Sequence, residues 1–185
     1  MSNGLIIAIA IIVIIALWFM SAYNKLVRLR NSAKEGFSTM DVYLKKRFDM
    51  IPNLVETVKG YASHESKTLE SVIEARNSIA NATSVGDQLE GENMLTNTLH
   101  SLFALSEAYP DLKANQNFID LQQKIEGIEE DIANSRKYYN GTVLALNNTI
   151  EMFPSNIAAK IFNFKQMSMF EVSNEGEREN VKVQF

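Results

Sequence analysis

Four charged side chains fall on or beside the apolar faces that helical spacing defines in this sequence: Arg30, Glu65, Arg76 and Arg136. A charge that leaves water without a partner is strongly unfavourable, so charges at such positions are expected to pair. The expected chemistry is a set of inter-helix salt bridges and hydrogen bonds that fixes helix register. A second interpretation stays open, in which part of the set forms a partner-binding surface near helix ends. The full candidate set is Asp41, Arg47, Asn53, Glu65, Arg76, Tyr109, Asp111, Asn117, Arg136 and Tyr139.

Motifs typical of catalysis or metal binding are missing from the sequence. Neither His64 nor His100 has a glutamate three residues before it, as ferritin-like di-iron sites require. His64-Glu65 begins like the zincin motif, but Thr68 stands at the position of the second histidine. There is no G-x-S-x-G elbow, no glycine-rich phosphate loop and no cysteine, which excludes disulfides, thiol catalysis and zinc–thiolate sites. We therefore expect no catalytic residue, metal site, cofactor or small-molecule substrate.

The element that must position the polar set begins with an apolar run from Leu5 to Met20, without charge or proline. With its flanks it gives a predicted transmembrane helix over residues 4–22, about 28 Å long at 1.5 Å per residue, which matches the hydrocarbon core of a bilayer. Two alternatives are a cleaved signal peptide and a buried core helix. A signal peptide lacks support here because no basic residue precedes the run and Met20 stands where cleavage after Ala22 would need a small residue.

Charge next to the apolar run predicts its orientation. Basic residues follow it before the first acid, Glu35, and no charged side chain precedes it. The positive-inside rule then places the N-terminus outside and the C-terminal domain in the cytoplasm, at the cell membrane. Trp18 could also be one more apolar residue of the helix. The predicted membrane-interface residues are Trp18, Tyr23, Lys25, Arg28 and Arg30, with Lys34 adding to the basic flank.

Composition and periodicity predict an all-α fold. The sequence has only three prolines and eight glycines and hardly any alternating segments, which favours helices over strands. It shows four amphipathic helices with short connections, which predict an antiparallel up-down bundle. The first helix should continue from the membrane segment to about Phe48, and Asp49 and Pro52 mark the break after it. The other three are expected from Pro52 to about Ile79, from about Gln88 to Tyr109, and from Phe118 to Ile150. Off the apolar stripe of the last helix lie four acids that we assign to a solvated face: Glu126, Glu129, Glu130 and Asp131.

Domain organisation follows from these elements. We expect a short extracytoplasmic N-terminus (1–3), the transmembrane helix (4–22), the helical bundle (23–153) and a tail (154–185) that packs on the bundle and ends loosely. A short helix is expected within residues 157–170. The alternating end, Val181–Phe185, could add to a sheet edge of another protein, although docking on its own domain or fraying is favoured.

Several stretches together resemble the LemA family over nearly the whole chain. They are Tyr23–Asn31, Asp41–Arg47, Asp49–Tyr61, His64-Glu65, Glu74–Arg76, Glu107–Ala114, Asn117-Phe118, Arg136 and Tyr139-Asn140. The resemblance implies a bacterial or archaeal-type protein with one N-terminal span, a helical bundle and no established catalytic activity. Magnetosome-associated members of the family suggest, by analogy, a membrane-organising role. Gly36 and Phe48 depart in size from the family's pattern, which concerns packing.

The function expected from these features is that of a membrane-anchored scaffold or adaptor without enzymatic activity. Its expected partners are membrane lipid, other copies of the chain and other membrane proteins, and no basic stripe outside the juxtamembrane cluster suggests nucleic acid. Two alternatives are a membrane-bound enzyme of hydrolase type and a bundle that senses a small ligand. An enzyme would need a nucleophile or metal site, and a sensor is usually an extracytoplasmic bundle between two spans.

Overall fold

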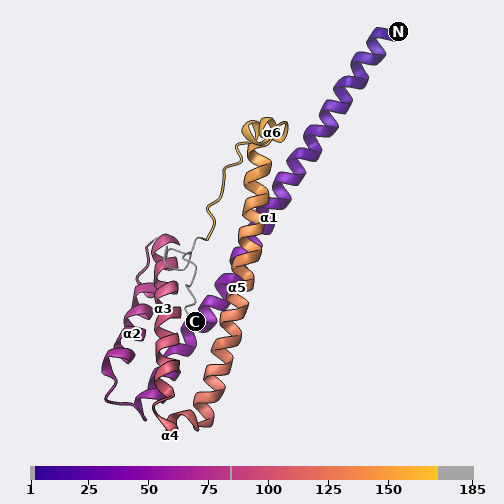
Figure 1. The fold of residues 1–185 in the computed structure, drawn as a ribbon. Coiled ribbons are helices and arrows are strands. Elements are labelled where there is room, and N and C mark those ends of the chain that lie inside the picture. Colours follow the sequence, from indigo (N-terminus) through magenta and orange to yellow (C-terminus); the bar gives the residue numbers. More distant parts are fainter. Residues whose placement is uncertain (1–2, 84, 171–185) are drawn as a thin grey trace, which may run out of the picture. The chain divides into compact units, whose positions relative to one another are not determined.

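The structure is a computed structural model that describes residues 3–83 and 85–170. Every regular element of this described part is a helix, which confirms the predicted all-α class (Figure 1). The helices are α1 Asn3–Lys59, α2 Ser66–Ala80, α3 Val85–Ser106, α4 Pro110–Lys113, α5 Gln116–Glu151 and α6 Ser155–Ile161. Val181–Phe185, for which sheet addition was considered, lies outside the described residues.

The predicted break at Asp49 and Pro52 is wrong, because α1 continues through Pro52 to Lys59. A proline inside a helix removes one backbone hydrogen bond and costs about 3 kcal/mol. Apolar side chains on both sides of it, Ile51, Leu54 and Val58, are almost completely buried and belong to one core cluster. Their packing offsets the local cost, and Pro52 itself lies on the exposed side.

The second predicted helix starts later than expected because α1 continues past Pro52. Residues 52–59 belong to α1, and the chain turns at Gly60, where the amides of Tyr61 and Ala62 both donate to the carbonyl of Val58 at 3.0 and 2.8 Å. Glycine weakens a helix, so the turn falls at the first residue after Lys59. α2 then begins at Ser66.

The later helices agree with the periodicity. α5 contains the whole predicted range from Phe118 to Ile150, and its stripe is buried at Ile125, Ile132 and Val143. The predicted end of the third helix at Tyr109 is three residues late, because α3 ends at Ser106. Pro110 starts α4 in its first turn, where a missing amide N–H costs nothing. The short helix expected after residue 157 is present as α6, which begins at Ser155.

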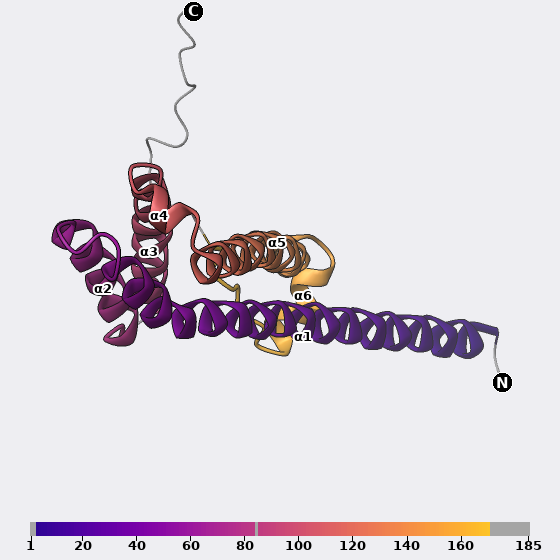
Figure 2. The same ribbon diagram turned by 90° about the horizontal axis from the view of Figure 1, so that it is seen from below.

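The described chain divides into two compact units. The second unit is built from residues 40–133, with the end of α1, α2, α3, α4 and the first half of α5. Helices α2 and α3 lie side by side in it (Figure 1, Figure 2). Its core is one cluster of buried apolar side chains, among them Leu54, Val72, Leu99, Leu112 and Phe118.

The first unit consists of residues 3–39 and 134–169. Its core joins Ala22 and Leu26 of α1 to Leu146 of α5 and to Ala158 and Ala159 of α6. The small side chains of Ala158 and Ala159 allow this close packing of α6. Gly36 allows a close approach of α1 and α5, because a Cβ at Gly36 would lie 3.0 Å from a ring carbon of Tyr138. The departure from the family pattern at Gly36 therefore has a packing reason.

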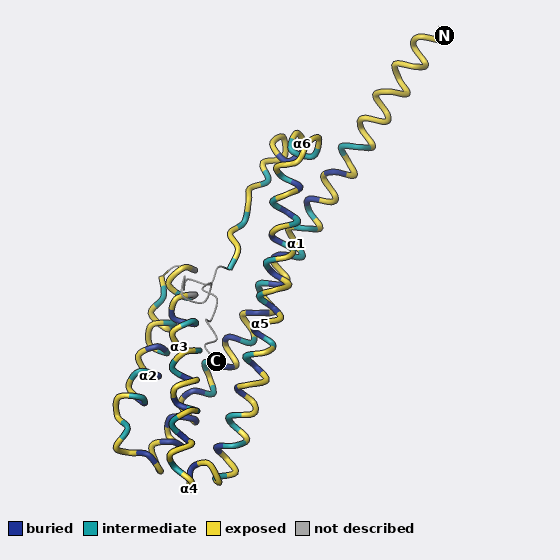
Figure 3. The backbone as a smooth tube through the Cα atoms, viewed as in Figure 1, coloured by how far each residue is buried: buried dark blue, intermediate teal, exposed yellow. Residues whose placement is uncertain are grey.

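The apolar start of α1 has no cover from the rest of the described chain. The large side chains from Leu5 to Leu17 are 48–65% exposed, whereas a buried stripe begins at Ala22 (Figure 3). By length and composition, α1 is the one helix of the described residues that could cross a membrane. A core helix buried within this chain, one of the alternatives for the run, is contradicted by this exposure.

Gly91 of α3 provides a test of the contact between α2 and α3. A Cβ at Gly91 would lie 2.9 Å from Ile79 Cγ1 and 3.1 Å from the backbone nitrogen of Ile79. We expect Gly91→Ala to destabilise the protein by about 1–3 kcal/mol through overpacking. Gly127→Ala, where nothing lies within 4 Å, should instead stabilise by about 0.5–1 kcal/mol through helix propensity.

Thermal unfolding of the full chain in detergent, followed by circular dichroism, measures both variants. A Gly91→Ala protein that is as stable as Gly127→Ala would contradict the close approach of the two helices.

Candidate functional site

Arg47 is the centre of a buried polar cluster in the second unit. Its side chain is 0% exposed and forms ion pairs with Glu92 of α3 and Glu129 of α5. The guanidinium also donates to Thr96 Oγ1 at 2.8 Å and to the carbonyl oxygen of Glu92 at 3.2 Å. Arg47, Glu92, Thr96 and Glu129, here called the Arg47 cluster, thereby join three helices.

The charges of the Arg47 cluster explain why it is stable in the interior. A guanidinium removed from water is tolerated only when most of its donors meet acceptors, and here two carboxylates, a hydroxyl and a carbonyl receive the hydrogen bonds of Nη1 and Nη2. One cation and two anions leave one excess negative charge. Because Glu129 retains 26% exposure, it lies nearest to water and can keep that charge solvated.

Sequence reasoning placed Arg47 in the candidate set but missed its partners. Assigning Glu129 to a solvated face was wrong, since its carboxylate binds Arg47. The available signal was spacing: Arg47 follows Met40 and Leu44 on the buried stripe of α1. Likewise, Glu92 precedes Leu95 by three residues, which places both on the inner face of α3.

Arg76 of α2 lies on an aromatic ring rather than in a salt bridge. Its Cζ is 4.1 Å from the centroid of the Phe48 ring, and Lys45 Nζ is 5.8 Å from the same centroid. A partly buried cation over an aromatic face is stabilised by the ring quadrupole. Phe48, which departs in size from the family's pattern, thus offers its ring to two cations. Arg76 was predicted to form an ion pair and forms this cation–π contact instead.

Glu65 and Tyr109, both in the predicted set, do meet. The phenol of Tyr109 donates to Glu65 Oε1 at 2.8 Å, between the residues that precede α2 and α4. This hydrogen bond raises the pKa of Tyr109 above its ordinary value, and partial burial and the charge of Glu65 act in the same direction. Nearby, the Asn115 amide donates to the Tyr61 hydroxyl at 2.8 Å, so this end of the unit is tied by side chains.

The rest of the predicted set does not converge. Asp41, Asn53, Asp111 and Asn117 are exposed in the second unit. In the first unit Arg136 is half-buried, whereas Tyr139 is buried and donates to the carbonyl of Ser168 at 2.8 Å. Burial raises the pKa of Tyr139.

The predicted membrane-interface residues all lie in the first unit. The centroid of the Tyr23 ring lies 4.7 Å from the ring centroid of Phe162 and 5.9 Å from that of Phe164. Arg30 Cζ lies 5.2 Å from the centroid of Phe164. Trp18 is half-buried against the core of this unit, and Lys25 and Arg28 are exposed.

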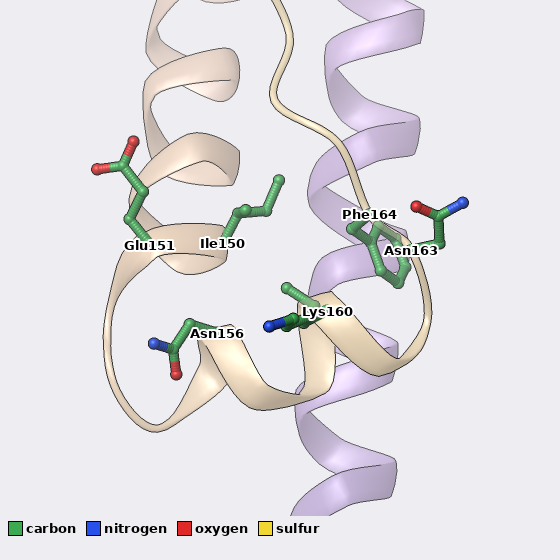
Figure 4. A pocket seen from close by; sticks show the side chains of 7 residues that line it. Ile150, Glu151, Asn156, Lys160, Asn163 and Phe164 are labelled. Carbon is green, nitrogen blue, oxygen red and sulfur yellow. The ribbon is translucent and has the colours of Figure 1, made fainter.

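A pocket of about 450 Å³ opens beside α6 (Figure 4). Its polar lining includes Glu151, Asn156, Lys160 and Asn163, and Phe164 closes one side. Most of these side chains are exposed, so the pocket is a surface feature rather than an enclosed cavity. Within the described residues, no three His, Asp or Glu side chains come together as metal ligands could.

Replacing Arg47 tests the Arg47 cluster. We expect Arg47→Met to lower the free energy of unfolding by about 3–5 kcal/mol, because Glu92 would stay in the interior without this counter-charge. The matched control is Lys113→Met, which removes the exposed pair with Glu107 and should cost less than about 1 kcal/mol. Denaturant unfolding of the full chain in detergent measures both. Equal losses in the two variants would contradict a structural role for the cluster.

The hydrogen bond between Tyr109 and Glu65 predicts a pH effect. Because only the neutral phenol donates, its stabilisation should be complete below pH 10 and lost as the pH rises through the raised pKa of Tyr109. Tyr109→Phe should therefore unfold at a lower temperature than the parent at neutral pH, and the difference should shrink as the pH rises through the raised pKa of Tyr109. A difference that persists unchanged in alkaline solution would be the opposite result.

Comparison with known proteins gives the family. The LemA family model matches residues 36–185, a range that contains the resembling stretches from Asp41 to Asn140. Protein LemA of Metamycoplasma hominis is 24% identical over 151 residues, which cover 81% of this chain and 69% of that protein. Magnetosome protein MamQ of Magnetospirillum gryphiswaldense is 23% identical over 201 residues, covering 94% and 74%. Magnetosome protein MamQ 1 of Paramagnetospirillum magneticum is 23% identical, covering 84% and 66%. The predicted resemblance is confirmed: this chain belongs to the LemA family.

Proposed function

We propose that this chain is a single-pass, membrane-anchored helical scaffold or adaptor that self-associates or binds other membrane proteins. One observation carries the proposal: α1 begins with an apolar surface that nothing in the described chain covers, and the same helix contributes to both helical units. A helix that is apolar on all sides is stable in lipid. Its continuation then holds folded helices at the membrane.

The proposed topology has the N-terminus outside and the helical units in the cytoplasm. Four basic side chains follow the apolar run within four turns, Lys25, Arg28, Arg30 and Lys34, and all are exposed. Exposed basic residues beside a span are retained on the cytoplasmic side. Tyr23, with an apolar ring and a polar hydroxyl, suits the same interface.

The helical arrangement that we propose is the antiparallel up-down bundle. Short connections support it, since six residues (60–65) separate α1 from α2 and four (81–84) separate α2 from α3. Helices joined so closely pack as antiparallel neighbours.

Recognition rather than catalysis is the role that the polar side chains support. Arg47 is committed to an inter-helix cluster, Arg76 to an aromatic ring, and Glu65 to Tyr109. These contacts fix helix register, as a scaffold requires. The relatives named magnetosome proteins support an organising role by analogy.

Oligomeric state tests the proposal. We expect light scattering after chromatography in mild detergent to give a protein mass above that of one chain, and amine-reactive crosslinking in native membranes to recover multimers or complexes with other membrane proteins. Ala8→Ile is the control: it removes the weak Gly4/Ala8 pair of small residues, so assembly through the helical units should persist. Monomers alone in detergent, together with no crosslinked product in membranes, would refute the scaffold.

A further inference from the structure

Four large apolar side chains at the corner between α5 and α6 are exposed. Phe153 is 79% exposed, and Met152, Ile157 and Ile161 are also exposed. Ile157 and Ile161 are four residues apart and share one face of α6, whereas Ala158 and Ala159 point into the core. α6 is therefore apolar on two sides: small residues pack inward and large residues face outward.

An exposed group of large apolar side chains marks a contact with protein or lipid. The position of α6 along α1 favours contact with lipid over contact with protein. Ala158 and Ala159 pack against Ala22 and Leu26, and Trp18 packs against the same cluster. Ala22 follows Met20, the last residue of the apolar run, by two residues, about 3 Å along the helix axis. α6 thus lies at the level where α1 stops being apolar on all sides.

The direction and charge of α6 agree with a membrane surface. The helix runs crosswise to α1 and α5 (Figure 1, Figure 4), as a helix lying in the plane of an interface would if α1 crossed the bilayer. Lys160 on α6 and Lys25 and Arg28 on α1 are exposed, and they suit anionic phosphate headgroups. The rings of Tyr23 and Phe162 meet edge-on, with their centroids 4.7 Å apart, and a tyrosine ring is typical of a membrane interface.

We propose that α6 and the turn before it form a second membrane contact, with Phe153, Ile157 and Ile161 inserted at the boundary between headgroups and acyl chains of a phospholipid bilayer. This inference rests on the proposed span of α1. A contact of this kind would fix the first unit against the membrane surface at two points, α1 and α6. It would also limit rotation of this unit about the axis of α1.

Because the chain has no cysteine, single cysteines can be labelled without background. The full chain with Phe153→Cys or Ile157→Cys carries a fluorescent probe and is reconstituted into vesicles of phosphatidylcholine and phosphatidylglycerol. Brominated lipid quenches a probe in the bilayer, and aqueous iodide quenches one in water. We expect several-fold stronger quenching by brominated lipid than by iodide at both positions.

Two controls separate the possible failures. Ile12→Cys reports on the apolar part of α1, and Tyr138→Cys is a 52% exposed aromatic position of the same unit, further back on α5. We expect the probe at position 12 to be quenched by brominated lipid, like the probe at position 153, and the probe at position 138 to be quenched by iodide.

If Ile12 responds to lipid while Phe153 and Ile157 respond to iodide, the α6 contact is refuted and the span stands. If neither quencher reaches Phe153 and Ile157, protein covers them, which also refutes the α6 contact. If Ile12 responds to iodide, the span itself is refuted.

Discussion

The structure depends on one uncompensated surface, the apolar start of α1. From Leu5 to Leu17 every large side chain is about half exposed or more, and no other described segment packs on it. Each Å² of apolar area left in water costs about 25 cal/mol, so this surface, which the described residues leave uncovered, is unfavourable in water. From Ala22 onward the same helix buries only one stripe, which passes through Leu26, Ala33, Met40 and Leu44 at steps of four or seven residues. The change at Ala22 separates the part of α1 that no described segment covers from the part that packs on other helices.

Two residues interrupt the apolar stripe of α1, and the structure explains both. Gly36 is buried where the helix approaches Tyr138 and Tyr139 closely. Arg47 is fully buried and binds carboxylates from α3 and α5. A buried ion pair adds little net stability over an apolar contact, but losing one partner is costly because the other charge stays in the interior.

Periodicity predicted the helices well where packing and local preference agree. α5 has a regular stripe and no proline, and its range was predicted almost to the residue. At Pro52 the two conflict, and burial of Ile51, Leu54 and Val58 outweighs the local cost, so the predicted break was wrong. The interior cluster was predicted only in part, because the face of a single helix does not reveal which neighbour will approach it. Glu129 lies beside the buried Ile128 on α5, and only the arrival of Arg47 turns it from a surface acid into an ion-pair partner.

Fractionation of cells followed by mass spectrometry tests the central claim most directly, that the N-terminal part of α1 remains attached and lies in the bilayer. The protein should stay in the membrane pellet after an alkaline wash, and its mass should equal that of the whole chain. Recovery of a soluble protein that has lost its first twenty or so residues would contradict the account, since the apolar segment would then be a cleaved signal.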